Sequence, residues 1–378
     1  MYVAEALGLT KPAAEKLKEK NVLKEAFIKH PFFPDVIDAV RFDKKFAGLE
    51  EGTVVAKTIH GVEVVHGFPK IRRALTLYPT IKLHFKGEIV FEEKMNGYNV
   101  RIVMFGKNLY ALTRRGFICP YTTEKARELI NESFFKDFPK FMLCCEAVGK
   151  YSPYVPKDVY GVDFDFYVFD IREKRSGKPL PIREKERICE EYGLNLAPIL
   201  AECRAEEGHI VGRRVIEELE GSGREGVVIK DVNMVVEPIK YTTSETNCSD
   251  LSYAFRYFNE YGKDFMFSRI VREGFQSFEF DDEEKFRERC FRLGKAILES
   301  LVKSIKDVSE GRKVVERVEL TFSSFETFEL FTEHLKRSGV NFEVVELKKR
   351  EGKVHAIIDR VMKSTTDKIK SHLGGALW

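Results

Sequence analysis

The sequence lacks the long apolar runs that mark membrane proteins. No segment approaches the roughly 18 consecutive apolar residues that a bilayer-spanning helix needs. Residues Met1 to Lys20 also contain no apolar stretch followed by a cleavage signal, which a secretory leader would require. We therefore expect a protein that is neither embedded in a membrane nor exported.

Cysteines are few and show no paired spacing. The chain has seven of them, and none is arranged as Cys-x-x-Cys. An odd number without a framework argues against a disulfide-stabilised exported domain. Cys144 and Cys145 are adjacent in an apolar run, which indicates reduced residues in a core. These features favour a reducing compartment, and we expect the protein in the cytoplasm.

Neither sign of charge is in large excess. Lysine and arginine number 63, aspartate and glutamate number 60, and the formal net charge is +3. This balance neither requires nor excludes a nucleic-acid partner, because one groove can be basic on a nearly neutral protein. The hydrophobic content of 43% indicates a folded chain, and 378 residues allow two or three domains.

The patterns along the chain predict four parts, of which the first two contain most of the strands. Residues 1–60 form an N-terminal module of short elements, with a helix over Lys11–Lys29. Residues 61–245 alternate in the manner of strands near 87–94, 98–105, 109–114, 141–146, 160–171, 225–230 and 234–241. Two helices are predicted among these strands, one capped by Thr122 or Thr123 and running to about Lys136, the other over Arg183–Tyr192.

The last two parts are a helical segment over 246–312 and a small α/β unit over 313–378. The α/β unit has the order strand, helix, hairpin and helix, with the hairpin turn at Glu351-Gly352. Within 282–307, apolar residues recur at helical spacing, at Phe286, Cys290, Leu293, Ile297, Leu301 and Ile305. This stripe is either a core contact within the chain or a contact between two copies, and the spacing leaves both readings open.

The most informative segment is the run from Phe91 to Arg101, which contains Lys94. Apolar residues before and after it indicate two strands, and Gly97 allows a tight turn between them. A lysine at such a junction can face a cleft, where burial or a nearby cation turns its amine into a nucleophile. A surface lysine in a hairpin is the plain alternative, and the segments that follow argue against it.

Five further segments carry side chains suited to phosphate chemistry. They are Thr113-Arg114-Arg115-Gly116, Glu146-Ala147-Val148-Gly149, Phe166 to Asp170, Glu225-Gly226-Val227-Val228 and Ile239-Lys240. Carboxylates at the ends of apolar strands are costly to bury unless they are paired or face a cleft, where they can hold a divalent cation or ribose hydroxyls. Basic side chains such as those of Arg114 and Lys240 can neutralise phosphate charge.

The alternation of side chains along a strand predicts which face of the sheet some of these residues occupy. Tyr167 and Phe169 are expected on one face, where an aromatic ring either stacks on a purine or packs in the core. Lys230 lies five positions after Glu225, so we expect it on the opposite face of the sheet. For this reason we favour Lys240 over Lys230 as the site residue.

These segments together resemble the covalent nucleotidyltransferase superfamily of ATP-dependent ligases and mRNA capping enzymes. Lys94-Met95-Asn96-Gly97 resembles its first motif, Lys-x-Asp-Gly, and the segments above resemble motifs Ia, III, IIIa, IV and V in that order. The six motifs span about 150 residues of this chain. One such match would carry little weight, whereas six in order are specific.

Two positions and the flanking regions narrow the resemblance. Asn99 stands where DNA ligases and capping enzymes usually have arginine and a group of RNA ligases has asparagine, and Asn96 replaces the usual aspartate of the first motif. The second replacement puts in doubt any role that needs a carboxylate there. The residues after 245 show no run of five short strands, as the OB-fold of DNA ligases and capping enzymes would. The layout resembles the archaeal ATP-dependent RNA ligases, which form homodimers.

The resemblance implies a fold, a reaction and a set of site residues. The fold would be α+β, with an ATP-grasp-like nucleotidyltransferase domain of antiparallel sheets and helices between the N-terminal module and the helical and α/β C-terminal region. Lys94 would be the nucleophile that takes AMP from ATP before single-stranded RNA with 5′-phosphate and 3′-hydroxyl ends is joined. Lys240 and Arg114 would assist catalysis. The nucleotide would be held by Glu92, Lys94, Asn99, Arg114, Glu146, Phe169 and Lys240, and a Mg²⁺ or Mn²⁺ ion by Glu225 and Glu146.

Candidate RNA contacts and two other functions also follow from the sequence. Basic and aromatic residues that suit a single-stranded nucleic acid are Arg72, Arg73, Lys150, Tyr151, Tyr154 and Lys157. One alternative is another enzyme of the superfamily, a DNA ligase or a GTP-using capping enzyme. The other is a non-catalytic RNA-binding protein that keeps the same fold, since fold alone does not secure function.

Overall fold

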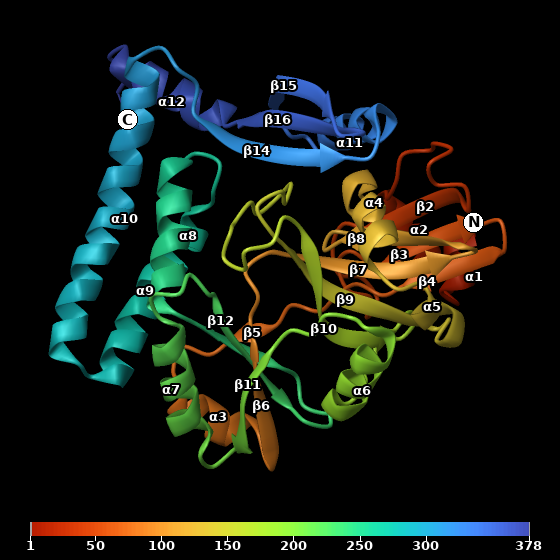
Figure 1. The fold of residues 1–378 in the computed structure, drawn as a ribbon, viewed down its shortest axis with the longest axis horizontal. Coiled ribbons are helices and arrows are strands. Elements are labelled where there is room, and N and C mark those ends of the chain that lie inside the picture. The colour runs from red at the N-terminus through yellow and green to blue at the C-terminus, as the bar shows by residue number, and fades with distance from the viewer. Residues whose placement is uncertain (1, 378) are drawn as a thin grey trace.

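The computed structural model describes residues 2–377 and arranges them around four β-sheets (Figure 1). The N-terminal sheet has the order β1-β2-β3-β4 and is accompanied by two short helices. These elements are α1 (Tyr2–Ala6), α2 (Lys11–Glu19), β1 (Leu23–Glu25), β2 (Val36–Phe42), β3 (Val54–Thr58) and β4 (Gly61–Val65). Each strand of this sheet pairs antiparallel with the next one along the chain.

The helix predicted over Lys11–Lys29 is wrong in its second half. It ends at Glu19, and Asn21 adopts a positive φ of 46° that no helix tolerates. The residues after Asn21 instead pair as β1 with β2, where Lys24 lies opposite Arg41. Helical spacing in the sequence was outweighed here by the gain from completing the sheet.

Two larger sheets form the middle of the molecule. One has the order β10-β9-β7-β8 and the other β11-β6-β12-β13-β5. Their strands are β5 (Arg72–Arg73), β6 (Glu88–Glu93), β7 (Tyr98–Phe105), β8 (Asn108–Thr113), β9 (Phe141–Val148), β10 (Asp165–Glu173), β11 (Ile199–Arg204), β12 (Gly226–Asp231) and β13 (Ile239–Thr242). The strands expected near 87–94, 98–105, 109–114, 141–146 and 225–230 are thus confirmed, whereas β10 and β13 begin about five residues later than expected.

Helices cover the outer faces of both central sheets. They are α3 (Tyr78–His84), α4 (Pro120–Leu129), α5 (Ser133–Asp137), α6 (Ile182–Tyr192) and α7 (Gly208–Leu219). Apolar residues of α3 and α7 pack on β6 and β12, and those of α4, α5 and α6 pack on β7 and β9. Figure 1 shows α3 and α7 to the left of β6 and β11, and α6 on the other side beside β10.

The helix expected from Thr122 or Thr123 to Lys136 is corrected in two ways. It begins at Pro120, after Cys119, and it stops at Leu129 before a separate short helix starts at Ser133. Proline suits the first helical position because it lacks only an N–H that would have no partner there. The Thr123 hydroxyl instead accepts a hydrogen bond from the backbone N–H of Ala111, so it ties the helix to β8.

The C-terminal region consists of three long helices and a small three-stranded sheet. The long helices are α8 (Ser244–Arg256), α9 (Lys263–Phe280) and α10 (Glu283–Ser309). The sheet has the order β14-β16-β15, from β14 (Val315–Phe322), α11 (Phe325–Arg337), β15 (Phe342–Arg350), β16 (Lys353–Val361) and α12 (Lys363–Leu373). The expected order of elements and the turn at Glu351-Gly352 are confirmed, since both turn residues have positive φ.

Within residues 2–377, no helix is both long enough and apolar enough to cross a membrane. All seven cysteines fall in this range, and each is a free thiol. Cys144 and Cys145 are fully buried in β9, which confirms their placement in a core.

Candidate active site

A cavity of about 550 Å³ lies between the two central sheets and the N-terminal loops. The sheets contribute Glu92, Glu93, Lys94, Met95, Asn99, Arg114, Glu146, Phe169, Val228, Lys230 and Lys240. The segments before β6 contribute Glu51, Phe68, Lys70 and Ile71. All seven residues predicted to bind the nucleotide therefore line one cavity, whereas Glu225 adjoins it through Lys94. A cavity of this size suits a nucleotide-sized ligand.

The register of the larger sheet explains why its polar residues meet. Glu92 on β6 lies opposite Val228 on β12, and Val228 lies opposite Lys240 on β13. Lys240 in turn lies beside Arg73 on the edge strand β5. Directly paired residues share a face of a sheet, so Glu92, Val228, Lys240 and Arg73 form one row across four strands. Lys94 follows Glu92 by two positions and joins the same face.

Lys94 makes a close charged contact at the edge of the cavity. Its Nζ lies 2.5 Å from Oε2 of Glu225, and its backbone N–H donates to the carbonyl of Gly226 at 2.8 Å. Gly226 has a φ of 140°, and a Cβ there would lie 2.3 Å from the carbonyl oxygen of Tyr241. A residue with a side chain would therefore push β12 away from β13 and separate Glu225 from the lysine.

The register of the smaller sheet brings the remaining polar residues to the same cavity. Asn99 on β7 lies opposite Glu146 on β9, and Val100 lies opposite Thr113 on β8. The next residue after Thr113 is Arg114, which leaves the end of β8 beside Asn99. Gly97 allows the approach of the β6–β7 turn, because a Cβ there would meet the carbonyl oxygen of Ala147 at 2.2 Å.

Burial and charge shift the protonation of two site residues. Burial raises the pKa of Glu146 to about 7, with Glu225 raising it further and Lys94 opposing the rise. Burial lowers the pKa of Lys240 to about 7, and the charges of Arg73 and Lys94 lower it further. Both groups can thus gain or lose a proton near neutral pH, and such perturbed groups in a cavity are typical of functional sites.

Lys230 lies on the cavity side of the sheet, so its predicted place on the opposite face is wrong. Glu225 precedes β12, and the unusual backbone of Gly226 interrupts the alternation between Glu225 and Lys230. Val228 and Lys230, which are two positions apart within the strand, both line the cavity. The choice of Lys240 as the site residue remains a prediction; the Nζ of Lys230 is engaged by the carboxylates of Glu92 and Asp170.

Glu92 belongs to a buried network of charges beneath the cavity. Its side chain is fully buried, and its two oxygens pair with the amines of Lys185 and Lys230. Burial alone would raise the pKa of Asp170 in the same network, but Lys230 and Arg172 outweigh it and hold that pKa at about 2. The carboxylate of Glu92 is therefore occupied within the protein, and only the backbone of this residue remains to contact a ligand.

An aromatic pair forms one end of the cavity. Phe169 and Phe68 meet edge to face with ring centres 5.2 Å apart, and both line the cavity. Tyr167 and Phe169 pack against the same small cluster around Met95, as the alternation predicts, but only Phe169 reaches the cavity. Sequence reasoning missed Phe68, Lys70 and Glu51, because they come from irregular segments without a motif.

Asn96 has a structural role that a carboxylate would not fill. Its side-chain amide donates a hydrogen bond to the carbonyl of Gly223 at 3.2 Å, and its backbone N–H donates to the Tyr160 hydroxyl at 2.9 Å. An ionised aspartate has no N–H to donate. The asparagine thus joins the lysine-bearing turn to the loop that leads into Glu225.

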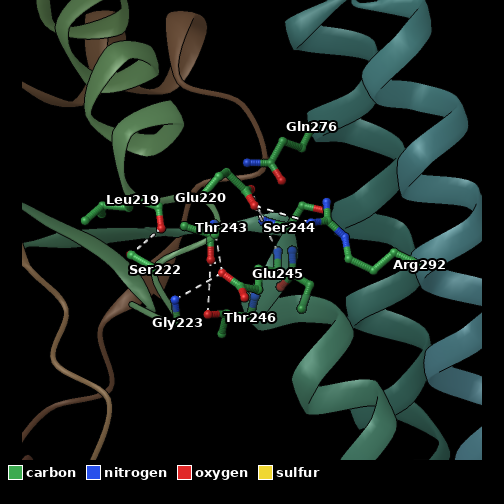
Figure 2. A network of polar contacts seen from close by, with 12 residues as sticks. Leu219, Glu220, Ser222, Gly223, Thr243, Ser244, Glu245, Thr246, Gln276 and Arg292 are labelled. Carbon is green, nitrogen blue, oxygen red and sulfur yellow. Dashed lines mark hydrogen bonds and ion pairs between the residues drawn. The ribbon is translucent and has the colours of Figure 1, made fainter. Parts of the chain in front are cut away.

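The loop before Glu225 is held by the N-terminus of α8 (Figure 2). Glu220 accepts hydrogen bonds from the backbone N–H groups of Ser244 and Glu245, at 2.7 and 3.3 Å. Glu245 returns the contact, accepting from the N–H groups of Gly221 and Gly223 at 3.0 and 3.2 Å. Arg292 of α10 donates to the Ser244 hydroxyl at 2.9 Å. The helical segment therefore fixes the backbone from which Glu225 projects.

Several of the candidate RNA-binding residues already have partners within the chain. Arg72 is exposed and paired with Glu237, and Lys150 is paired with Asp163. The hydroxyl of Tyr154 is engaged by His334 at 2.9 Å. Of these candidates, Arg73 is the one that lies in the row of residues facing the cavity, beside Lys240.

Within residues 2–377, no group of three or more His, Cys, Asp or Glu side chains is arranged to hold a metal ion. Two carboxylates lie near Lys94. Glu225 forms an ion pair with it, and Glu146 is close enough for the charge of Lys94 to lower its pKa. Mg²⁺ is commonly held by one or two carboxylates together with water and substrate phosphates, so this pair fits such an ion.

Comparison with known families gives two matches along the chain. The RNA ligase family model matches residues 87–242, and the model of the Pab1020 ligase C-terminal region matches residues 253–376. The first match contains Lys94, Arg114, Glu146, Glu225 and Lys240, and the second begins within α8.

Relatives match over the full length. A curated protein of Methanocaldococcus jannaschii is 42% identical, with 100% of this chain and 96% of the relative covered. A solved archaeal ATP-dependent RNA ligase is 38% identical with a TM-score of 0.92, covering 100% of this chain and 98% of that one. A solved Aquifex aeolicus protein, provisionally described as an ATP-dependent DNA ligase, is 25% identical with a TM-score of 0.89, covering 98% of this chain and 100% of that one.

Proposed function

The chain belongs to the family of archaeal ATP-dependent RNA ligases, and from this membership we propose the reaction that its cavity performs. The protein joins the 5′-phosphate and 3′-hydroxyl ends of single-stranded RNA, and a lysine–AMP adduct and an RNA adenylate are the intermediates. The observation that carries the proposal is the contact of Lys94 with Glu225 in a cavity that Arg114 and Lys240 also line.

In the first step, Lys94 attacks the α-phosphorus of ATP. The bond from Nζ to phosphorus forms, the bond from that phosphorus to the bridging oxygen breaks, and pyrophosphate leaves with the electron pair. Glu225 lies within hydrogen-bond reach of Nζ and orients the amine, whose proton passes to water. Lys240 and Arg114 stabilise the charge on the α-phosphate, which is the main catalytic requirement of phosphoryl and nucleotidyl transfer.

The second and third steps reuse the same residues. The 5′-phosphate of RNA takes AMP from Lys94, and the 3′-hydroxyl then attacks that phosphate and releases AMP. Phe169 stacks on the adenine, Glu146 holds either the ribose or the metal ion, and Asn99 and Arg114 contact the phosphates or the RNA end. Phe169 on β10 and Asn99 on β7 line the cavity from two strands of one sheet, with β9 between them.

Glu225 and Glu146 are the residues we assign to a divalent cation, Mg²⁺ or Mn²⁺. When bound, the ion would neutralise phosphate charge and help to orient the reacting oxygens. Glu146 is suited to a changing ligand set, because burial raises its pKa to about 7 and it can exchange a proton for a cation.

We also propose that two copies associate through the outer side of α9 and α10. The side of α10 that packs on α8 is polar, with Ser300 bonded to Ser252 at 2.7 Å and Ser304 buried. The other side leaves large apolar residues in solvent, and Phe278 of α9 and Phe291 of α10 are 82% and 74% exposed. Apolar surface of this kind marks an interaction site, and a symmetric homodimer covers it. The stripe of 282–307 is thus assigned to the contact between copies.

A cytoplasmic location completes the proposal. It is supported by the seven free thiols, which persist in a reducing compartment. The boundaries at residues 60, 245 and 312, which divide the chain into four parts, remain predictions.

The proposal is tested by incubating the protein with α-labelled ATP or GTP and a divalent metal, followed by denaturing electrophoresis. We expect an acid-labile label from ATP that is absent in Lys94→Ala. Lys136→Ala, which removes an exposed lysine of α5, is the matched control and should label normally. Lys94→Ala should still seal RNA that already carries 5′-AMP, because the last step does not use the nucleophile.

Other outcomes would select the alternatives. Labelling by GTP alone would indicate a capping-type enzyme, and sealing of nicked duplex DNA in preference to RNA would indicate a DNA ligase. A protein that binds RNA equally well with or without Lys94 and accepts no label from either nucleotide would be a non-catalytic binding protein.

A further inference from the structure

A second group of cations lies beyond Lys240, on the side away from the aromatic end of the cavity. Arg73 stands next to Lys240 in parallel register on β5. Two arginines of α9 lie close to it. The charge of Arg269 lowers the pKa of Arg73, and the charge of Arg73 lowers the pKa of Arg272. These three arginines come from two elements nearly 200 residues apart in the sequence. The reaction described above assigns none of them a role.

Hydrogen bonds join the arginines through two neutral side chains. Arg73 donates to the Thr242 hydroxyl at 2.6 Å, and Thr242 donates to the side-chain oxygen of Asn247 at 3.2 Å. Arg272 approaches the same oxygen of Asn247 at 3.5 Å. Arg73, Thr242, Asn247 and Arg272 line one small hollow in the surface. The two guanidinium groups therefore face a common space.

Two of the three arginines form no short ion pair, although the more distant carboxylates of Glu225 and Asp250 partly offset their charge. Arg269 forms an ion pair with Asp250 at 2.8 Å. In the described range 2–377, neither Arg73 nor Arg272 has a carboxylate within 4.0 Å, although both are half-buried. Burial lowers the pKa of Arg73 to about 10 and that of Arg272 to about 9, and each is lowered further by neighbouring arginines. Unpaired cations held together away from water are costly, and an anion bound between them would remove that cost.

The row of residues across the sheet gives the direction in which a nucleotide lies. The row runs from Glu92 through Val228 and Lys240 to Arg73. Phe169 stands at the Glu92 end, because its backbone carbonyl accepts hydrogen bonds from Lys185 and Lys230, the two partners of Glu92. Neighbouring strands are about 4.8 Å apart, so Arg73 is the next cation after Lys240 along this line. A base at Phe169 and an α-phosphate at Lys240 direct the remaining phosphates toward Arg73.

We propose that Arg73 and Arg272 bind the β- and γ-phosphates of ATP and retain them as the pyrophosphate leaving group. The proposal rests on the function given above, because it completes the nucleotide site of the same reaction. As the bond from the α-phosphorus to the bridging oxygen breaks, the leaving oxygen gains negative charge, and the two guanidinium groups neutralise it. The helix α9 thereby supplies part of the ATP site from outside the two central sheets.

The terminal phosphate of an RNA strand is the alternative anion for Arg73 and Arg272. That phosphate has to reach the α-phosphorus of the adduct, which places it beside Lys94 and Lys240. Arg272 lies beyond Arg73 as seen from Lys240, with Thr242 and Asn247 between them. The β- and γ-phosphates lie beyond the α-phosphate on this side, and the arrangement therefore favours ATP over the RNA end.

The test separates the steps in Arg73→Gln and Arg272→Gln. Single-turnover formation of lysine–AMP is measured against ATP concentration, its reversal against pyrophosphate concentration, and sealing of pre-adenylylated RNA without ATP. We expect the ATP and pyrophosphate concentrations for half-maximal rate to rise about tenfold or more, from loss of a charge-assisted contact. Sealing of pre-adenylylated RNA should be unchanged. Arg287→Gln, at an exposed position of the neighbouring helix α10, is the control for loss of a surface arginine.

Each contrary result has a defined meaning. Unchanged dependence on ATP and pyrophosphate would overturn the assignment, and a defect confined to transfer of AMP to RNA would move the arginines to the RNA end. If the rates of all steps fell equally and Arg272→Lys did not restore them, Arg73 and Arg272 would have only a structural role. If the unaltered protein formed no adduct, the proposed function itself would fail. Calorimetry with inorganic pyrophosphate would then decide the anion site separately, since binding lost in Arg272→Gln would uphold it and absence of binding would refute it.

Discussion

His334 is a single residue whose burial links stability to pH. Its ring is 4% exposed on α11, and its Nε2 contacts the Tyr154 hydroxyl at 2.9 Å. Burial lowers the pKa of His334 to about 4, against about 6.5 in an unfolded chain. Between these values the unfolded state binds a proton that the folded state does not. The free energy of unfolding therefore falls as the pH falls from about 6.5 toward 4.

We expect His334→Gln to reduce this dependence on pH. The unaltered protein should lose about 2 kcal/mol of stability through this residue between pH 7.5 and pH 5, and the variant should not. The measurement is denaturant unfolding at both pH values. Tyr154→Phe keeps the imidazole buried and should retain the dependence. Equal slopes in the parent protein and His334→Gln would contradict the assignment.

The residues of the site differ in how far the sequence predicts them. Lys94, Arg114, Glu146 and Lys240 stand in short motifs at strand ends, and the structure brings their side chains to one cavity. The face of Lys230 was predicted wrongly, because one glycine with positive φ breaks the alternation on which such predictions depend. Phe68 reaches the cavity from an irregular segment, and only the fold reveals it.

At the scale of elements, α8 and the loop before Glu225 hold each other in place. The carboxylate of Glu245 accepts from two backbone N–H groups of that loop, and Glu220 of the loop side accepts from two at the start of α8 (Figure 2). Carboxylates at a helix N-terminus also complement the helix dipole. The exchange makes the position of Glu225 depend on a helix that contributes nothing to the cavity.

We expect Glu245→Ala to slow the formation of lysine–AMP about tenfold while changing the ATP concentration for half-maximal rate little. Loss of the two hydrogen bonds should also cost about 1–2 kcal/mol of stability. The measurements are single-turnover labelling and denaturant unfolding. Glu218→Ala, which removes an exposed carboxylate on α7, is the control. A variant as fast as the control would show that the loop keeps its shape without this contact.

Elements with a strong periodic pattern were predicted well, and their ends less so. The helices over 183–192, 282–307 and 325–337 and the hairpin of β15 and β16 follow directly from spacing and turn chemistry. The second half of the helix that begins at Lys11 and the cap at Thr122 or Thr123 were wrong, because pairing with β2 and contact with β8 decided the local structure. Contacts between distant segments of the chain are not visible in a local pattern.

For the whole molecule, the exposed apolar side of α9 and α10 determines the expected assembly. A protein of 43.7 kDa that forms the proposed dimer should have twice this mass in solution. We expect Phe291→Glu to give the mass of one chain, because a buried charge in an apolar interface is costly. The measurement is size-exclusion chromatography with light scattering. Leu83→Glu places the same charge at an apolar residue of α3 that is 84% exposed, and it should leave the dimer intact.

A single-chain mass for the unaltered protein at micromolar concentration would refute the dimer. The same result would leave the site intact, because every residue lining the cavity comes from one chain.

One hydrophobic core cluster contains residues from both sides of the predicted boundary at residue 60. This cluster combines Ala26, Phe33, Val54 and Ala56 of the N-terminal module with Val103, Tyr110, Leu112 and Cys144 of the smaller central sheet. Arg101 adds a buried link, donating to the carbonyls of Gly52 and His66 at 2.8 and 2.7 Å. Two stretches of sequence that a local pattern separates are therefore packed as one body.

That shared core has a consequence for how the chain can change over evolutionary time. A larger side chain at Ala56 has to be accommodated by residues of β7 and β8, and the reverse holds for Val103, since close-packed interiors transmit a change of one methylene. Substitutions in the two sheets should therefore occur in compensating pairs. Exchange of the N-terminal module between distant relatives should fail unless β7, β8 and β9 are inherited with it.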